Sequence, residues 1–244
     1  MSTEVMREHK AAATTAGILY ISGTVAGVLS MVLSAPVRDA GDPSAAAAEH
    51  SGVVVTGALL VLVMGLSLAF VPVVLFPVLR RVDEVLATGY LIMRGAVETA
   101  CYVLLAAGWL LLVPLGEAIS AGPGTASPAG VRLGSLVVDA DAVNAVLTLV
   151  FCLGATMFYV LLHRSRIVPR WITVWGLVAI PLYVVADLLA MYAVIGANSS
   201  QQVLMFMPLA VQEMVLAVWM IARGFRPPAV PTTSEVRDGT LVGG

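Results

Sequence analysis

Two glutamates and one arginine lie deep inside long apolar stretches of this sequence, where an unpaired charge is costly. Arg94 and Glu98 are four residues apart and so share one face of a helix, whereas Glu213 lies in a separate stretch. At about 1.5 Å per residue, both glutamates fall roughly 12–15 Å from the nearest end of their stretch, near the middle of a bilayer. Tyr102 and Gln212 are neutral hydrogen-bond partners nearby in the sequence. We therefore predict an intramembrane polar site formed by these five residues.

The predicted site holds two carboxylates but only one guanidinium. Arg94 can satisfy Glu98, Glu213 or both, and one carboxylate remains in excess. Burial and a like-charged neighbour both disfavour a second negative charge, so this carboxylate would hold a proton or bind a cation. A site of this kind could relay protons or recognise a charged substrate. The alternative is a buried ion network that only fixes the register of the helices.

A second group of polar residues lies at the ends of two later apolar stretches. The distribution of Lys and Arg in the sequence predicts that these ends lie on the non-cytoplasmic side of the membrane. Asp187 is about two helical turns from the end of its stretch, while Asp139, Asp141 and Asn144 mark the start of the preceding one. These four residues are candidates for an outward-facing polar group. For Asp139 and Asp141 we favour helix capping, because acidic residues in a first turn complement the helix dipole.

The sequence carries no recognisable enzyme signature. His9, His50 and His163 lie outside the apolar stretches or at their ends, so they offer no base to a nucleophile inside them. There is no HExxH motif, no metal-binding Cys/His spacing and no glycine-rich phosphate loop. We expect no metal and no cofactor, and a membrane-embedded enzyme is the least favoured functional interpretation.

Six long apolar stretches must position these residues. The chain is 59% hydrophobic and only 11% charged, whereas soluble globular proteins carry about 25% charged residues. Each stretch is long enough for the roughly 20 residues of a membrane-crossing helix, and its continuous apolar character excludes the alternating strands of a barrel. The predicted spans are residues 12–34, 53–79, 89–113, 142–162, 172–195 and 203–222. The predicted fold class is an all-α integral membrane bundle of six transmembrane helices.

The positive charges follow the gaps between these spans. One set of alternate gaps and the two ends carry Arg7, Lys10, Arg80, Arg81, Arg164, Arg166, Arg170, Arg223, Arg226 and Arg237. The opposite gaps carry only Arg38 and Arg132. Because cytoplasmic loops are enriched in Lys and Arg, we predict a protein of the inner (plasma) membrane with both termini in the cytoplasm.

The remaining segments suggest a single membrane domain. We assign residues 1–11 to a cytoplasmic N-terminal segment, residues 12–226 to the six-helix domain and residues 227–244 to a disordered cytoplasmic tail. Residues 35–52 are expected to form a turn followed by a short surface helix. Residues 116–136 are rich in Gly, Ala, Ser and Pro, a composition that disfavours regular structure.

Four segments resemble a family of bacterial membrane proteins. They are FPVLR at residues 76–80, YLIMR at 90–94 followed by Glu98, YVLLHRSRIVPRWITVWG at 159–176, and PLAVQEMVLAVWMIARGF at 208–225. Together they resemble the proteins grouped as domain of unknown function 4386 (DUF4386), over about residues 16–225. The resemblance implies a multi-pass membrane protein of unassigned activity and suggests that Arg94, Glu98 and Glu213 belong to the family pattern. It transfers no substrate and no catalytic residue.

Three functional interpretations follow from these observations. A small transporter or proton-coupled permease that uses the intramembrane polar site is the favoured one. A structural or regulatory membrane subunit, in which the polar residues only fix helix packing, is the main alternative, and the membrane-embedded enzyme is third. The expected partners are the lipid bilayer, anionic lipid headgroups on the cytoplasmic side, and a second copy or another membrane protein. No basic patch with interleaved aromatics indicates nucleic acid.

Overall fold

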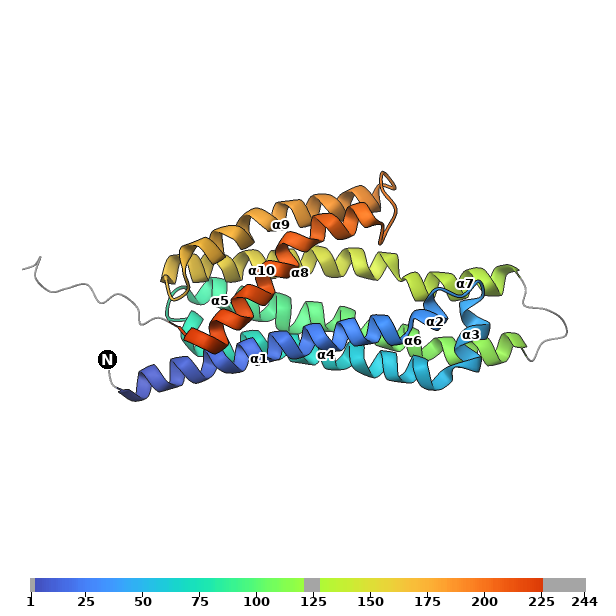
Figure 1. Cartoon of the computed structure of the whole chain (residues 1–244), viewed down its shortest axis with the longest axis horizontal. Helices are drawn as coiled ribbons and strands as arrows, with labels where there is room; N and C mark the ends of the chain where they lie inside the picture. The colour runs from blue at the N-terminus through green and yellow to red at the C-terminus, as the bar shows by residue number, and fades with distance from the viewer. Residues whose placement is uncertain (1–2, 121–127, 226–244) are drawn as a thin grey trace, which may run out of the picture.

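The computed structural model describes residues 3–120 and 128–225, with every side chain in these ranges except those of residues 3–8, 120, 141 and 142. Within these ranges every regular element is a helix (Figure 1). Six helical segments are long and apolar enough to cross a membrane, at residues 9–33, 51–79, 84–119, 128–165, 170–191 and 200–223. The prediction of an all-α bundle with six membrane-crossing helices is therefore confirmed.

The six segments run alternately between the two ends of an elongated bundle (Figure 1). The first two segments are α1 (Thr3–Leu33) and α4 (Ser51–Leu79). The third is a continuous helix made of α5 (Glu84–Ile92), η1 (Met93–Glu98) and α6 (Thr99–Ser120), and the fourth consists of α7 (Pro128–Asp139) followed by α8 (Asp141–Ser165). The last two are α9 (Arg170–Met191) and α10 (Ser200–Arg223). The α4–α5 and α8–α9 connections lie at the same end as the start of α1 and the last residue of α10. We call this the basic end, because Arg80, Arg81, Arg166 and Arg223 lie there.

Two short helices close the other end of the bundle. α2 (Ala35–Arg38) and α3 (Pro43–Glu49) form the predicted turn and short helix, and the Asp42 carboxylate caps α3 by accepting from the amides of Ser44 and Ala45. The predicted surface helix has one exposed face, with Ala45 and Glu49, whereas Pro43, Ser44 and Ala47 on its other face are buried against α6 and α7. Gly116 and Gly134 make this approach possible, since a Cβ at either position would collide with Ser44.

The prediction that residues 116–136 lack regular structure is wrong for the described residues. α6 continues to Ser120 and α7 begins at Pro128. Val138 of α7 is buried with Val37 and Leu112 in a small apolar core at this end. Burial of this face outweighs the unfavourable local propensities of Gly and Pro. The predicted disordered tail, residues 227–244, lies outside the described residues.

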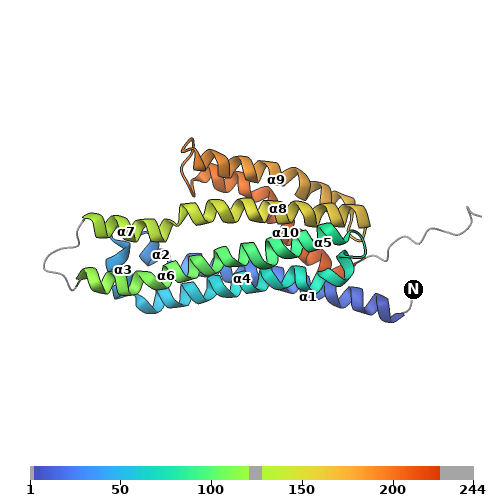
Figure 2. The same cartoon turned by 180° about the vertical axis from the view of Figure 1, so that it is seen from behind.

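Close packing of α1 places the helices around the predicted site. Gly23 and Gly27 of α1 face Leu68 and Met64 of α4, while Gly17 faces the backbone of α10 at Ala217. Figure 2 shows α10 crossing from α9 at the far end toward α1 at the basic end. The two helices therefore diverge away from the basic end.

Apolar side chains cover much of the outer surface of the bundle. Along α4, for example, Leu59, Leu66, Phe70 and Val73 each expose about half of their surface. In water such a surface would favour aggregation, whereas hydrocarbon tails accommodate it at no cost. The surface thus agrees with the apolar character of the six helices.

Candidate functional site

A π-helical segment carries two of the predicted site residues. Between α5 and α6 the chain forms η1 over Met93–Glu98, with Arg94 and Glu98 both buried. A π-turn accommodates one additional residue, and such turns occur frequently at functional sites. The Thr99 hydroxyl donates to the backbone oxygen of Arg94 at 3.3 Å and so satisfies a carbonyl in this widened turn. The sequence reasoning placed Arg94 and Glu98 on one helical face but gave no indication of the π-helix.

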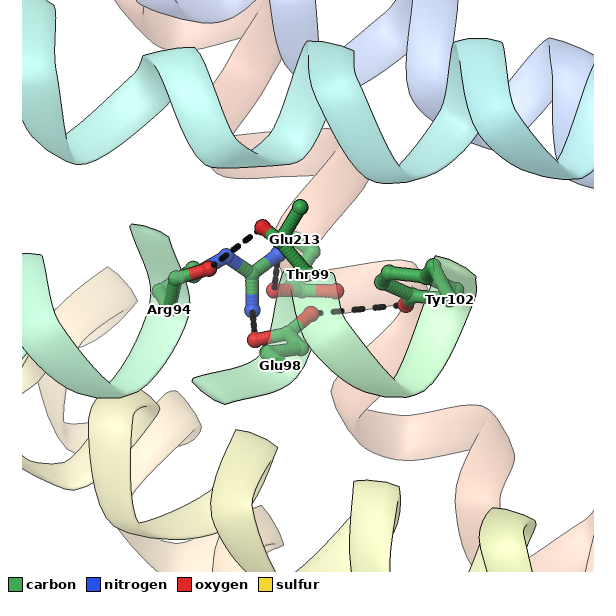
Figure 3. Close-up of polar contacts among 5 residues, drawn as sticks. All are labelled: Arg94, Glu98, Thr99, Tyr102 and Glu213. Carbon is green, nitrogen blue, oxygen red and sulfur yellow. Dashed lines mark hydrogen bonds and ion pairs between the residues drawn. The ribbon is translucent and has the colours of Figure 1, made fainter. Parts of the chain in front are cut away.

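The structure brings Arg94, Glu98, Tyr102 and Glu213 together (Figure 3). Arg94 Nη1 lies 3.5 Å from Glu98 Oε2, and Arg94 Nη2 lies 3.7 Å from Glu213 Oε1. The Tyr102 hydroxyl donates to Glu98 Oε1 at 3.3 Å. Exposure of the side chains is 2% for Arg94, 1% for Glu98 and 16% for Glu213. We call these four residues the polar cluster.

The ion pairs of the polar cluster are long, and several of its atoms lack hydrogen bonds. Both N···O distances exceed the 2.7–2.9 Å of charge-assisted hydrogen bonds. Within the described residues, Nε and Nη1 of Arg94, Oε2 of Glu98 and Oε1 of Glu213 have no hydrogen-bond partner. A network whose role is to fix packing normally satisfies all of its buried polar atoms. This cluster therefore retains hydrogen-bonding capacity for a further group.

Two aromatic rings hold the guanidinium of Arg94. Its Cζ lies 5.2 Å from the ring centroid of Tyr20 in α1 and 4.9 Å from that of Phe151 in α8. Cation–π contacts at these distances stabilise a desolvated cation. Sequence reasoning missed both rings, because an aromatic residue in a membrane helix is common and only the tertiary packing shows which ones contact Arg94.

A cavity of about 290 Å³ reaches the polar cluster. We call it the cluster cavity. It is lined by Arg94, Glu98, Tyr102 and Glu213, by the aromatic residues Tyr20, Phe151 and Tyr183, and by residues of α1, α4, α8 and α10 including Thr24, Val28 and Ala210. Thr24 and Val28 of α1 and Ala210 of α10 are also exposed on the surface. The cavity therefore opens where α1 and α10 diverge, and Glu213 is the cluster carboxylate nearest to this opening.

Gln212 does not join the polar cluster as predicted. Its Oε1 accepts from the Tyr159 hydroxyl at 2.6 Å, and its Nε2 donates to the backbone oxygen of Ile172 at 3.0 Å. Successive residues of a helix project about 100° apart, so Gln212 and its neighbour Glu213 face different surroundings. The buried Gln212 side chain instead connects α8, α9 and α10.

Replacing Gln212 by Leu is expected to lower the free energy of unfolding by about 1–3 kcal/mol, because two buried partners lose their hydrogen bonds. Denaturation with sodium dodecyl sulfate in mixed micelles, followed by circular dichroism, would measure this. Gln201→Leu provides the control, since Gln201 is exposed on the same helix. A Gln212→Leu protein as stable as this control would show that the connection contributes little.

The second predicted group is only partly brought together. Asp187 and Asn144 line one cavity, with Thr148 as a hydrogen-bond partner of Asp187. Asp139 lines a different depression beside Leu104 and Gly108, and its backbone oxygen accepts from the Asn144 amide at 3.0 Å. The capping prediction is wrong for Asp139, which ends α7, while Ala140 precedes α8 in a left-handed conformation without a side-chain cap. The side chain of Asp141 lies outside the described set.

The described residues contain no group of three His, Cys, Asp or Glu side chains that could hold a metal ion. Glu98 and Glu213 are the carboxylates of the cluster cavity. Two carboxylates beside a guanidinium can form ion pairs and exchange protons.

Comparison with known proteins identifies a family but no characterised relative. The family model described as "Domain of unknown function (DUF4386)" matches residues 15–224, which include all four residues of the polar cluster. No curated protein matches the chain, and no solved structure matches it.

Proposed function

The chain belongs to the DUF4386 family, and from the geometry of its polar cluster we propose that it is a membrane permease that exchanges protons for a small organic cation. The observation that carries this proposal is the excess of one carboxylate in a cavity that opens at the protein surface. Arg94 balances one negative charge. The other is balanced by a proton in one state and by the cation in the other.

The surroundings of the polar cluster favour a cation over an anion. Tyr20, Tyr102, Phe151 and Tyr183 line the cavity beside the carboxylates, and the faces of aromatic rings attract cations. The volume of about 290 Å³ is at the lower limit of typical ligand cavities, which restricts the substrate to a small molecule. Glu213 is the exchanging group in this proposal, because it is more exposed than Glu98.

The alternative of a purely structural subunit is less well supported by the same residues. Such a role predicts a closed network with paired atoms, whereas the polar cluster has unpaired donors and acceptors and an adjoining cavity. Membrane proteins conserve costly intramembrane charges mostly for transport or signalling. The carrier interpretation accounts for the cavity and for the unpaired atoms together.

The inner (plasma) membrane, with both termini in the cytoplasm, is the location that we propose. The excess of cations at the basic end supports this orientation. At the same end Arg166, Arg170 and Trp171 line a groove with Trp219, a combination suited to anionic lipid headgroups at the membrane surface. Periplasmic or extracellular substrate would then reach the bundle from the end that carries α2, α3 and α7.

Uptake of radiolabelled guanidinium into proteoliposomes tests the proposal. Guanidinium is permanently charged and cannot cross the bilayer as a neutral base. Vesicles with an acidic interior are expected to accumulate it while their interior becomes more alkaline, one proton leaving for each cation that enters. Glu213→Gln should reduce both signals at least about tenfold, because a neutral amide releases no proton.

Glu84→Gln is the matched control, since Glu84 is exposed at the start of α5 and makes no contact with the cavity. Its uptake should equal that of the unmodified protein. Equal uptake by the Glu213→Gln and Glu84→Gln proteins, when both are folded, would refute the proposed exchange.

A further inference from the structure

A second, larger cavity lies at the end of the bundle opposite the basic end. It has a volume of about 520 Å³ and is enclosed by the start of α8, the end of α9, the start of α10 and the connection between the last two. We call it the Asp187 cavity. Its polar lining consists of Asn144, Thr148, Asp187, Asn198 and Gln202.

Asp187 is a buried carboxylate without a countercharge. Its exposure is 4%, and its Oδ2 has no hydrogen-bond partner among the described residues. None of the described residues that line the cavity is Lys or Arg. A buried charge of this kind is strongly disfavoured unless it is neutralised. The cavity therefore offers one negative group to a ligand or to a proton.

Asn144 offers an acceptor beside Asp187. Its side-chain nitrogen donates to the backbone oxygen of Asp139, and its side-chain oxygen can accept from a ligand. Gln202 Oε1 accepts from the backbone N–H of Asn198 at 2.7 Å and thereby holds the α9–α10 connection in place, with Asn198 in the left-handed conformation that Asn tolerates. A fixed carboxylate beside an amide oxygen suits a cation that donates several N–H groups.

An aromatic pair separates the Asp187 cavity from the cluster cavity. Phe206 lines the former and Tyr183 lines the latter. Their rings are stacked, with centroids 3.8 Å apart and an angle of 12° between the planes. Tyr183 and Asp187 are four residues apart on α9 and so lie on one face of it. Separation of the two rings would connect the cavities and expose aromatic faces to a passing cation.

We propose that the Asp187 cavity is a second cation site, specific for small organic cations with N–H donors such as guanidinium, and that it loads the cluster cavity past Tyr183 and Phe206. The binding site stands on the geometry of the Asp187 cavity alone. The loading step rests on the proposed function. Binding and transport are therefore separable in experiment.

Equilibrium dialysis of the full chain in detergent against radiolabelled guanidinium tests the site. At saturation Asp187→Asn should bind one guanidinium fewer per chain than the unmodified protein, whereas Asp39→Asn, at an exposed aspartate, should bind the same number. Tetramethylammonium has no N–H group and should compete only at the cluster cavity. It should therefore displace guanidinium from the Asp187→Asn protein, which keeps the cluster cavity, but leave one guanidinium bound to the Glu213→Gln protein, which keeps the Asp187 cavity. Unchanged guanidinium binding by a folded Asp187→Asn protein would overturn the proposal.

A second variant covers the case in which Asp187→Asn does not fold. Asn144 is exposed at the edge of the cavity, so Asn144→Leu should fold and weaken binding at this site at least about threefold. Unchanged affinity in this variant would count against the site. Loss of a binding site in Asp187→Asn, together with normal proton exchange in Glu213→Gln, would support the Asp187 cavity and refute the proposed function.

Discussion

Replacing Arg94 by Met is expected to lower the free energy of unfolding by about 3–5 kcal/mol, the largest effect on stability that we expect from a single substitution in this protein. Met occupies a similar apolar volume but leaves Glu98 and Glu213 buried without their countercharge. It also removes the cation–π contacts with Tyr20 and Phe151. Denaturation with sodium dodecyl sulfate in mixed micelles, followed by circular dichroism, would measure the loss.

The companion experiment removes the carboxylates as well. A variant that combines Arg94→Met with Glu98→Gln and Glu213→Gln should recover about half of the lost stability or more, because no unpaired charge remains. Arg81→Met serves as the control, since Arg81 is exposed at the basic end and its loss should cost less than about 0.5 kcal/mol. The electrostatic explanation fails if the combined variant is no more stable than Arg94→Met alone.

Replacing Gly17 by Val is expected to have the next largest effect, a loss of about 3 kcal/mol. A Cβ at this position would lie 2.6 Å from the backbone oxygen of Ala217 and 2.7 Å from Ile221 Cγ1. The backbone oxygen cannot rotate away, so α1 and α10 must separate. Because these two helices flank the cluster cavity, uptake of guanidinium should fall together with stability. Thermal denaturation in detergent and the proteoliposome assay would record the two effects.

Gly17→Ala and Gly52→Ala form a matched pair for this prediction. Gly52 lies in the first turn of α4, and a Cβ there meets no atom within 4 Å. Ala is favoured over Gly in a helix, so Gly52→Ala should be neutral or slightly stabilising. Gly17→Ala should already be destabilising. If the two variants were equally stable, the close approach of α1 and α10 would not limit stability.

Much of the architecture could be predicted because the bilayer imposes strong and local rules on a sequence. The length of each apolar run and the cost of buried charges identified the six helices and the residues Arg94, Glu98 and Glu213. The pairing of Arg94 with Glu98 followed from a spacing of four residues. Its pairing with Glu213, more than a hundred residues away, was a hypothesis from depth alone, which the geometry supports.

Two of the wrong predictions depend on packing between helices. In the sequence Gln212 neighbours Glu213, which predicts a place in the polar cluster, yet the direction of its side chain around α10 gives it Tyr159 as a partner. The composition of residues 116–136 predicts irregular structure, whereas α7 is stabilised by the apolar side chains that it buries against α3 and α6. No pattern in the sequence predicts the aromatic rings around Arg94 or the stacked pair of Tyr183 and Phe206 between the two cavities.

The π-turn explains how the third span keeps one line of residues facing inward. Five residues at intervals of four are all buried, namely Tyr90, Arg94, Glu98, Tyr102 and Ala106. In a regular α-helix each such step advances about 40° around the axis, so the line would wind through about 160° and its last members would face lipid. The one residue absorbed by η1 sets this winding back by about 100°. About 60° of winding remains, so the span acquires a periodicity of almost four residues, and its polar groups form a gently winding column along the bundle on one side of the span.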